Sequence, residues 1–265
     1  MPESSFPSRA RPREPMFFVP TVVVALTATL LGINAVVSAL SDTAQDALLR
    51  EFAFIPARLT LAIWPSRLEE LHADPYVLAL LGGGAKVWTL FTYALLHGSW
   101  THVLVNSIWL VAFGPPIARR FGAVRFLLFF AMTAIAGALA HWAVSPTDVS
   151  PLIGASAADS GLMAAAARFI FQPGAPLSGR RDLSRLMQEA GEEPRVPSLL
   201  ELLSQRRAII FIAIWMATNF VFGAGAQTLG ASEAPVAWIA HVGGFVAGLV
   251  AFPLFDRPAR RREQV

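Results

Sequence analysis

Four polar side chains in this sequence could form a nucleophilic site, although they lie far apart along the chain. Ser156 could act as a nucleophile if the imidazole of His241 accepted its hydroxyl proton. The oxyanion that follows would need fixed donors, which a neutral histidine N–H or an asparagine amide can supply. His102 and Asn106 are spaced so that they project from the same face of a helix. These residue types predict acyl transfer by a Ser–His pair, provided that the fold brings them together.

The composition indicates that these polar residues belong to a membrane protein. The chain has 265 residues, of which 55% are hydrophobic and 15% charged, and its mean hydropathy is +0.54. Soluble domains contain about 45–50% apolar and about 25% charged residues. The sequence has no cysteine, which excludes disulfides, thiolate metal sites and a cysteine nucleophile. It also has no His-Glu-x-x-His pair, so we expect no metal and no other cofactor.

Six apolar segments are each close to the length of about 20 residues that a bilayer requires. They cover residues 17–40, 90–113, 124–144, 154–172, 208–225 and 235–255. The first segment is longer than the core of a cleavable signal and is not followed by a small-x-small cleavage site, so we expect it to be retained. The sequence predicts an all-α, polytopic integral membrane protein with six transmembrane helices.

Basic residues are distributed unevenly between the two sides of this topology. Of the 21 lysine and arginine residues, only Arg50, Arg58, Arg67 and Lys86 lie on the side that holds residues 41–89. Because basic loops stay in the cytoplasm, we expect both termini to be cytoplasmic. The preference for arginine over lysine is typical of a GC-rich genome and favours a bacterial inner membrane. The sequence pI of about 10.1 then reflects this bias and predicts no nucleic-acid partner.

The remaining segments connect the helices of one membrane domain. Residues 1–15 are rich in proline, serine and arginine and are predicted to be a disordered cytoplasmic N-terminus. Residues 16–256 are predicted to form the membrane domain, followed by a basic cytoplasmic tail over 257–265. Within the domain, 41–89 is expected to be an external interfacial loop with short amphipathic helices, and 173–207 a cytoplasmic loop.

The predicted topology places the candidate residues at one depth. The second, fourth and sixth apolar segments all run from outside to inside, and their polar side chains lie toward their outer ends. Polar groups inside a bilayer are costly, which makes each of them a functional candidate. Ser156, His241, His102 and Asn106 could therefore meet in the outer part of the membrane.

Small residues predict which helices approach closely. Gly244 and Gly248 form a Gly-x-x-x-Gly pair on the sixth segment, and His241 lies on the same side as Gly244. On the fourth segment, Ala157 and Gly161 would form the matching face. Contact between these two faces would bring His241 to Ser156.

Three motifs resemble the signatures of the rhomboid family of intramembrane serine proteases, in its bacterial type. They are HGSWTHVLVN on the second segment, GASA at the start of the fourth, and AHVGGFVAG on the sixth. The family patterns are His-x-x-x-Asn, Gly-x-Ser-Gly and His-x-x-x-x-x-x-Gly, and Gly154 supplies the first glycine of the second pattern. The resemblance implies a rhomboid-like fold, a catalytic dyad without an aspartate, and an oxyanion site. The dyad would be Ser156 and His241, and the oxyanion site His102, Asn106 and the Ser156 backbone.

The resemblance also implies what the protein acts on. A rhomboid protease would cleave transmembrane or membrane-proximal segments of membrane proteins, so its partners would be a transmembrane substrate and the lipid bilayer. Two residues depart from the family pattern: Ala157 replaces the glycine after the serine, and Ser160 replaces an aromatic or large apolar residue. Together with Asp159, Ser160 would make the site more polar. His97 is a further candidate for lining the site.

Other interpretations stay open at this point. Ser156 or His241 taken singly could be an ordinary interfacial residue, and Asn219 could simply hydrogen-bond between helices. A catalytically silent family member would bind transmembrane clients without cleaving them, and a small transporter would use the polar side chains as an ion path. The oligomeric state is not predicted, because small-residue faces serve internal packing and dimers equally well.

Overall fold

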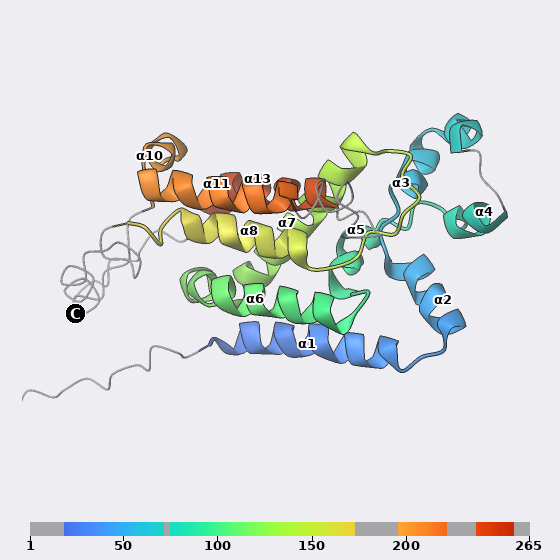
Figure 1. Ribbon diagram of the computed structural model, residues 1–265, viewed down its shortest axis with the longest axis horizontal. Helices are drawn as coiled ribbons and strands as arrows, with labels where there is room; N and C mark the ends of the chain where they lie inside the picture. Colours follow the sequence, from blue (N-terminus) through green and yellow to red (C-terminus); the bar gives the residue numbers. More distant parts are fainter. Residues whose placement is uncertain (1–18, 72–74, 173–195, 222–236, 257–265) are drawn as a thin grey trace, which may run out of the picture.

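The computed structural model describes residues 19–71, 75–172, 196–221 and 237–256, which form long helices lying side by side, with most of the shorter helices at one end and α10 at the other (Figure 1). The long helices are α1 (Thr21–Ser38), α6 (Trp100–Phe121), α7 (Ala123–Val144), α8 (Ser156–Ala167), α11 (Arg206–Phe220) and α13 (Trp238–Phe255). The shorter ones are α2 (Asp42–Phe52), α3 (Pro56–Ile63), the 3-10 helix η1 (Pro65–Leu71), α4 (Pro75–Leu81), α5 (Thr89–Thr92), the 3-10 helix η2 (Tyr93–Leu95) and α10 (Leu199–Leu203).

The helices confirm the prediction of an all-α membrane protein. Within the described ranges there is no β-strand, and one isolated bridge pairs Phe54 with Leu152. Helices α1, α6, α7 and α13 are long and apolar enough to cross a membrane. Helices α8 and α11 have 12 and 15 residues, so the count of six spans stays a prediction.

Several predicted segments lie outside the described residues. These are the N-terminal segment 1–15, the tail 257–265, and residues 173–195 of the predicted cytoplasmic loop. The end of the fifth predicted span, residues 222–225, also lies outside them. The described end of the cytoplasmic loop contains α10, which begins with a capping box between Ser198 and Glu201.

Helix α8 lies at the centre of the bundle, in contact with α6, α7 and α13. Every residue from Ala157 to Ala167 is buried, and most of them are alanine or glycine. Because these side chains are small, neighbouring backbones approach α8 closely. A Cβ added to Gly244 would lie 2.0 Å from the Ala157 carbonyl oxygen, and one added to Gly248 would lie 2.4 Å from that of Gly161. The small residues of α8 and α13 therefore pack backbone against backbone.

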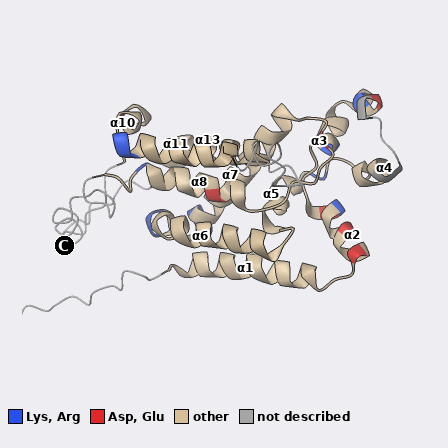
Figure 2. Cartoon of the chain, viewed as in Figure 1, with Lys and Arg blue, Asp and Glu red and all other residues tan. Residues whose placement is uncertain are grey.

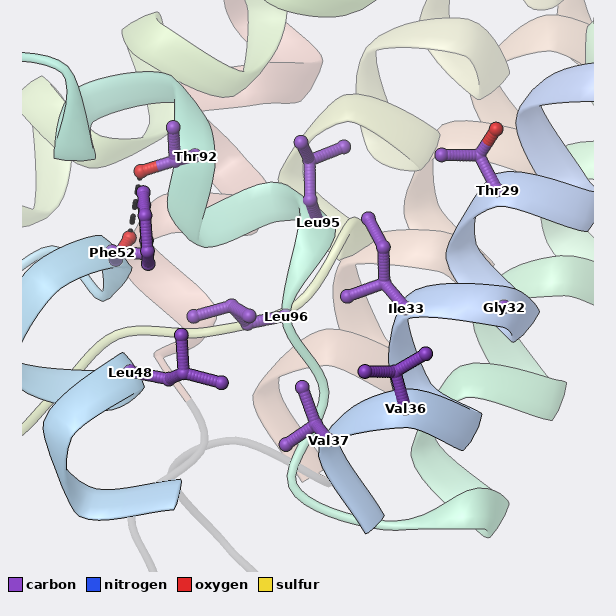
Figure 3. A pocket seen from close by; sticks show the side chains of 10 residues that line it. All are labelled: Thr29, Gly32, Ile33, Val36, Val37, Leu48, Phe52, Thr92, Leu95 and Leu96. Atoms are coloured by element: carbon purple, nitrogen blue, oxygen red, sulfur yellow. Dashed lines mark hydrogen bonds between the residues drawn. The ribbon is translucent and has the colours of Figure 1, made fainter. Parts of the chain in front are cut away.

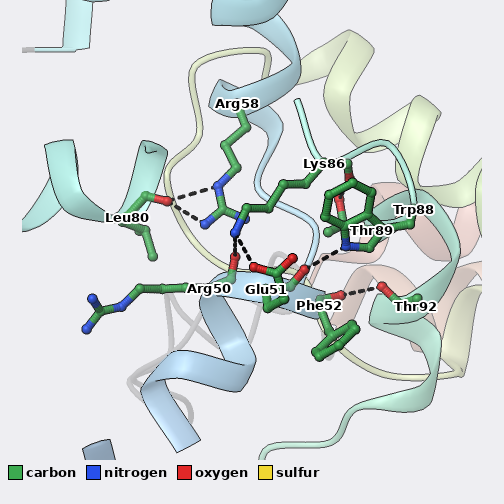
Figure 4. A network of polar contacts seen from close by, with 9 residues as sticks. All are labelled: Arg50, Glu51, Phe52, Arg58, Leu80, Lys86, Trp88, Thr89 and Thr92. Atoms are coloured by element: carbon green, nitrogen blue, oxygen red, sulfur yellow. Dashed lines mark hydrogen bonds and ion pairs between the residues drawn. The ribbon is translucent and has the colours of Figure 1, made fainter. Parts of the chain in front are cut away.

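The short helices between α1 and α6 are held by a polar network, which Figure 4 shows. The Lys86 ammonium pairs with the Glu51 carboxylate at 2.5 Å. The indole N–H of Trp88 donates to the Glu51 carbonyl at 2.9 Å, and the Thr92 hydroxyl donates to the Phe52 carbonyl at 2.8 Å. These bonds fasten the end of α2 to the segment that leads into α6.

The same region is joined to the C-terminal end of α7 and to the connection that follows it. The Trp142 indole N–H donates to the Thr60 hydroxyl at 2.9 Å, and a contact at 3.2 Å joins His141 to Asp148. Burial raises the pKa of the Asp148 carboxyl, but hydrogen bonds from His141 and Ser150 outweigh it and lower the pKa below its usual value. The Asp148 carboxylate is therefore ionised at neutral pH and fixes the connection between α7 and α8.

The two ends of the bundle differ in the charge of their side chains, as Figure 2 shows. Among the described residues, acidic side chains gather with basic ones around α2, whereas basic side chains dominate the opposite end near α6 and α11. At that end Arg120 pairs with Asp256 at 2.7 Å, which ties the end of α6 to the end of α13. This distribution agrees with the charge bias from which the orientation was predicted.

Candidate active site

Ser156 is the first residue of α8 and is positioned by the connection before it. The backbone N–H of Gly154 donates to the Tyr93 carbonyl at 3.0 Å, and the N–H of Ala155 donates to His97 Nε2 at 3.4 Å. Leu152 pairs with Phe54 through two backbone hydrogen bonds of 2.8 and 3.2 Å. The chain segment that leads into Ser156 is thus held in place by residues that precede α6 in the sequence.

Gly154 allows α6 to approach this connection closely. Its φ of +113° is one that residues with side chains rarely adopt. A Cβ at this position would lie 2.6 Å from His102 Nε2 and 3.5 Å from Asn106 Nδ2. The predicted oxyanion residues therefore flank the backbone just before Ser156, and only glycine fits both the conformation and the space.

The N-terminal end of α6 is fixed by its own cap. The Ser99 hydroxyl is the N-cap and accepts a hydrogen bond from the His102 backbone N–H at 3.1 Å. Asn106 is buried, and its Nδ2 has no hydrogen-bond partner among the described residues. A buried amide without a partner is costly, so this group is available to a ligand or to water.

His241 lies on α13 beside Ser156. The distance from His241 Nε2 to Ser156 Oγ is 2.7 Å, and that from His241 Nδ1 to Asn219 Oδ1 is also 2.7 Å. A hydroxyl and an imidazole at this distance are within reach for proton transfer. The chain of contacts joins three helices, α8, α13 and α11. Helix α8 begins at Ser156, so its first backbone N–H groups also lie at this point.

The three other residues predicted to line the site, His97, Asp159 and Ser160, differ in their contacts. His97 is buried, and its ring centroid lies 5.0 Å from that of His102. The Ser160 hydroxyl donates to the Ser156 carbonyl at 2.7 Å, so it is satisfied within its own helix. Asp159 is buried, and neither carboxylate oxygen has a hydrogen-bond partner among the described residues.

The methyl group of Ala157 on α8 packs against α7 at Gly137. A Cβ added to Gly137 would lie 2.6 Å from the Ala157 Cβ, so glycine at 137 leaves the space that this methyl fills. The glycine face of α13 meets the Ala157 backbone instead. Replacement of the expected glycine by Ala157 is therefore matched by a glycine on a facing helix.

A separate apolar pocket of about 510 Å³ lies away from these residues, between α1, α2 and the segment before α6 (Figure 3). Ile33, Val37, Leu48 and Leu95 are among the side chains that line it. None of its lining residues belongs to the predicted site. Its polar lining side chains are Thr29 and Thr92, whose hydroxyls donate to the carbonyls of Ala25 and Phe52, and no histidine or carboxylate lines it to act as a base, so it is not the candidate active site.

The contact between Asn219 and His241 links an additional residue to the candidate site. The sequence predicts for Asn219 only a hydrogen bond between helices. The available signal was one asparagine in an apolar segment. Its partner on α13 is decided by how α11 packs, which spacing along the chain does not reveal.

Part of this region is similar to known proteins. A family profile described as the Rhomboid domain matches residues 84–181. The "Putative rhomboid protease YdcA" of Bacillus subtilis is 34% identical over 119 residues, which cover 45% of this chain and 55% of that protein. RHOMBOID-like protein 1 of Arabidopsis thaliana is 30% identical over 152 residues, covering 56% of this chain and 38% of the relative. The rhomboid protease GlpG of Haemophilus influenzae is 33% identical over 63 residues, which cover 23% of this chain and 33% of that protein. The chain thus spans about half the length, or less, of these relatives.

Proposed function

We propose that the chain, whose residues 84–181 match the Rhomboid domain, is a rhomboid-type intramembrane serine endopeptidase that cleaves transmembrane or membrane-proximal segments of membrane proteins. The observation that carries this proposal is the distance of 2.7 Å between His241 Nε2 and Ser156 Oγ. A nucleophile and a base within hydrogen-bond reach on two facing helices form a dyad for acyl transfer.

The first half of the proposed reaction forms an acyl-enzyme. Ser156 Oγ attacks the carbonyl carbon of the scissile peptide bond while His241 Nε2 takes the hydroxyl proton. When the tetrahedral intermediate collapses, the C–N bond breaks and the imidazolium gives this proton to the leaving amine. The carbonyl carbon is then joined to Ser156 through an ester.

The second half hydrolyses that ester. His241 takes a proton from a water molecule, whose oxygen attacks the ester carbonyl, and returns the proton to Ser156 Oγ as the carboxyl product leaves. In both halves the negative oxygen would be stabilised by His102, Asn106 and the backbone N–H of Ser156. The unpartnered Nδ2 of Asn106, next to Gly154, supports this assignment.

The rival within the family is a silent protein that binds transmembrane clients without cleaving them. It is favoured by the two departures from the family pattern, the methyl of Ala157 and the hydroxyl of Ser160. The methyl faces Gly137, and the hydroxyl bonds to its own helix at 2.7 Å, so neither contact separates His241 from Ser156. We therefore favour the active enzyme.

The proposed setting is the inner membrane of a bacterium with both termini in the cytoplasm. The positions of the arginine and lysine residues along the chain support this orientation. Ser156 and His241 would then lie toward the outer face, and hydrolytic water would enter from that side. The substrate would be a transmembrane protein in the same bilayer.

The decisive test is cleavage of a model transmembrane substrate in liposomes. We expect wild type to cleave it, and Ser156→Ala and His241→Ala each to lose turnover by about 10⁴-fold or more. A serine-directed fluorophosphonate probe should label wild type but not Ser156→Ala. If wild type is folded but is neither labelled nor active, the silent alternative is correct. Solute flux that survives Ser156→Ala would instead indicate a transporter.

A further inference from the structure

The contact behind His241 carries a further assignment at the proposed active site. His241 Nδ1 lies 2.7 Å from Asn219 Oδ1, on the side of the ring opposite the contact with Ser156. The two nitrogens of a neutral imidazole are not equivalent: one carries a proton and the other a lone pair. Which one faces Ser156 decides whether the hydroxyl can donate its proton.

The asparagine amide is itself oriented by a second hydrogen bond. Asn219 Nδ2 donates to the Trp215 carbonyl on the same helix at 3.1 Å. Because the amide group has one donor end and one acceptor end, this bond turns Oδ1 toward His241. An amide oxygen can only accept, so His241 Nδ1 must carry the proton, and Nε2 is left with its lone pair facing Ser156 Oγ.

From this geometry we infer that Asn219 is a positioning residue, which holds His241 in the tautomer that can accept the Ser156 proton. The inference rests on the proposed protease function. Asn219 touches no reacting atom and acts only through His241, with its neutral oxygen in the place where a Ser–His–Asp triad has a carboxylate. It also stabilises the imidazolium that forms when His241 is protonated.

The test compares two replacements of Asn219 with one neighbouring control. Asn219→Leu keeps the approximate size but removes the acceptor, whereas Asn219→Asp keeps an acceptor oxygen at the same place. Thr218→Val is the control, because Thr218 is exposed and its hydroxyl donates only within α11, to the Ile214 carbonyl at 2.8 Å. All four proteins are purified in micelles, and folding is checked by thermal unfolding.

The first readout is the tautomer of His241, measured by ¹⁵N NMR of protein labelled in its histidine rings. The His241 signals are identified by their absence from His241→Ala. We expect Nδ1–H with unprotonated Nε2 in wild type, Thr218→Val and Asn219→Asp, and a mixture with the Nε2–H form in Asn219→Leu. A wild-type tautomer in Asn219→Leu would overturn the inference.

The second readout is cleavage kinetics in liposomes. We expect Asn219→Leu to lower kcat by about 10- to 100-fold with KM unchanged, since it impairs a general base whose full contribution is about 10²–10⁴. Asn219→Asp should restore kcat to within a few-fold of wild type. Equal kcat in Asn219→Leu and Thr218→Val, or no rescue by aspartate in folded protein, would contradict the inference. If wild type cleaves nothing, the proposed function fails, and the tautomer still decides the role of Asn219.

Discussion

Helices α8 and α11 each supply one member of the contact chain around His241, but they are held in very different ways. In α8, every residue from Ala157 to Ala167 is buried, and glycines of α13 approach its backbone directly. In α11, Ala208 and Trp215 are the buried residues, while Ile214 and Phe220 are 62% and 58% exposed. The proposed nucleophile therefore lies on a tightly packed helix, whereas the proposed positioning residue lies on a helix whose side chains are largely exposed among the described residues.

This difference indicates which residues of the site are held most rigidly. Contacts between two backbones cannot yield, so the position of Ser156 relative to α13 is fixed by small residues. Helix α11 is attached to α13 mainly through side chains, such as the stack of Trp215 on Phe245 with ring centroids 4.1 Å apart. We therefore expect substitutions around α8 to act severely and substitutions on α11 to act in a graded way.

The largest effect is expected from adding one methyl group where α13 meets α8. In Gly244→Ala the new Cβ would lie 2.0 Å from the Ala157 carbonyl oxygen, and backbone cannot rotate away from it. We expect a loss of stability above about 3 kcal/mol and a loss of turnover of about 100-fold or more. Thermal unfolding in micelles and cleavage in liposomes measure the two effects. Gly32→Ala on α1 is the control, since nothing lies within 4 Å of its added Cβ; equal behaviour of the two variants would refute the packing argument.

The next effect is expected just before α8, at Gly154. Alanine there combines the strain of a φ of +113° with a contact on His102, so we expect kcat to fall by about 100-fold in protein that still folds. Gly122→Ala isolates the strain, because Gly122 has a φ of +78° and open space around its Cβ position. It should lower stability by about 1–3 kcal/mol with near-normal kcat. A comparable loss of kcat in both variants would mean that backbone strain alone, and not displacement of His102, lowers kcat in Gly154→Ala.

The smallest effect is expected on α11. Trp215→Ala removes the stack with Phe245 and loosens the helix that holds Asn219. We expect kcat to fall only several-fold. Stability should fall by the cost of losing a buried side chain, together with the about 0.5–1.5 kcal/mol that the stack contributes beyond its buried area. Ile214→Ala on the exposed face is the control and should change neither quantity. A loss of kcat as large as in Gly244→Ala would show that α11 is held as rigidly as α8.

The sequence by itself determined the class of the protein and the residues of the candidate site. An excess of apolar residues in runs of membrane-spanning length allows only helices, because a bilayer cannot satisfy open backbone groups. The spacing of His102 and Asn106, and the small residues on two segments, are local properties of helices that can be read without a structure. The number of spans stays a prediction, since α8 and α11 are shorter than their apolar segments.

Only the tertiary structure decided which groups meet. The sequence presented Asn219 as one polar residue in an apolar segment, and Ala157 as a possible obstacle to close packing. Their effects depend on partners from other helices: Asn219 meets His241, and the Ala157 methyl faces Gly137. Such contacts join residues far apart in the chain and depend on how each helix is rotated and how deeply it lies. Local spacing fixes the face of a helix, but only packing fixes what that face touches.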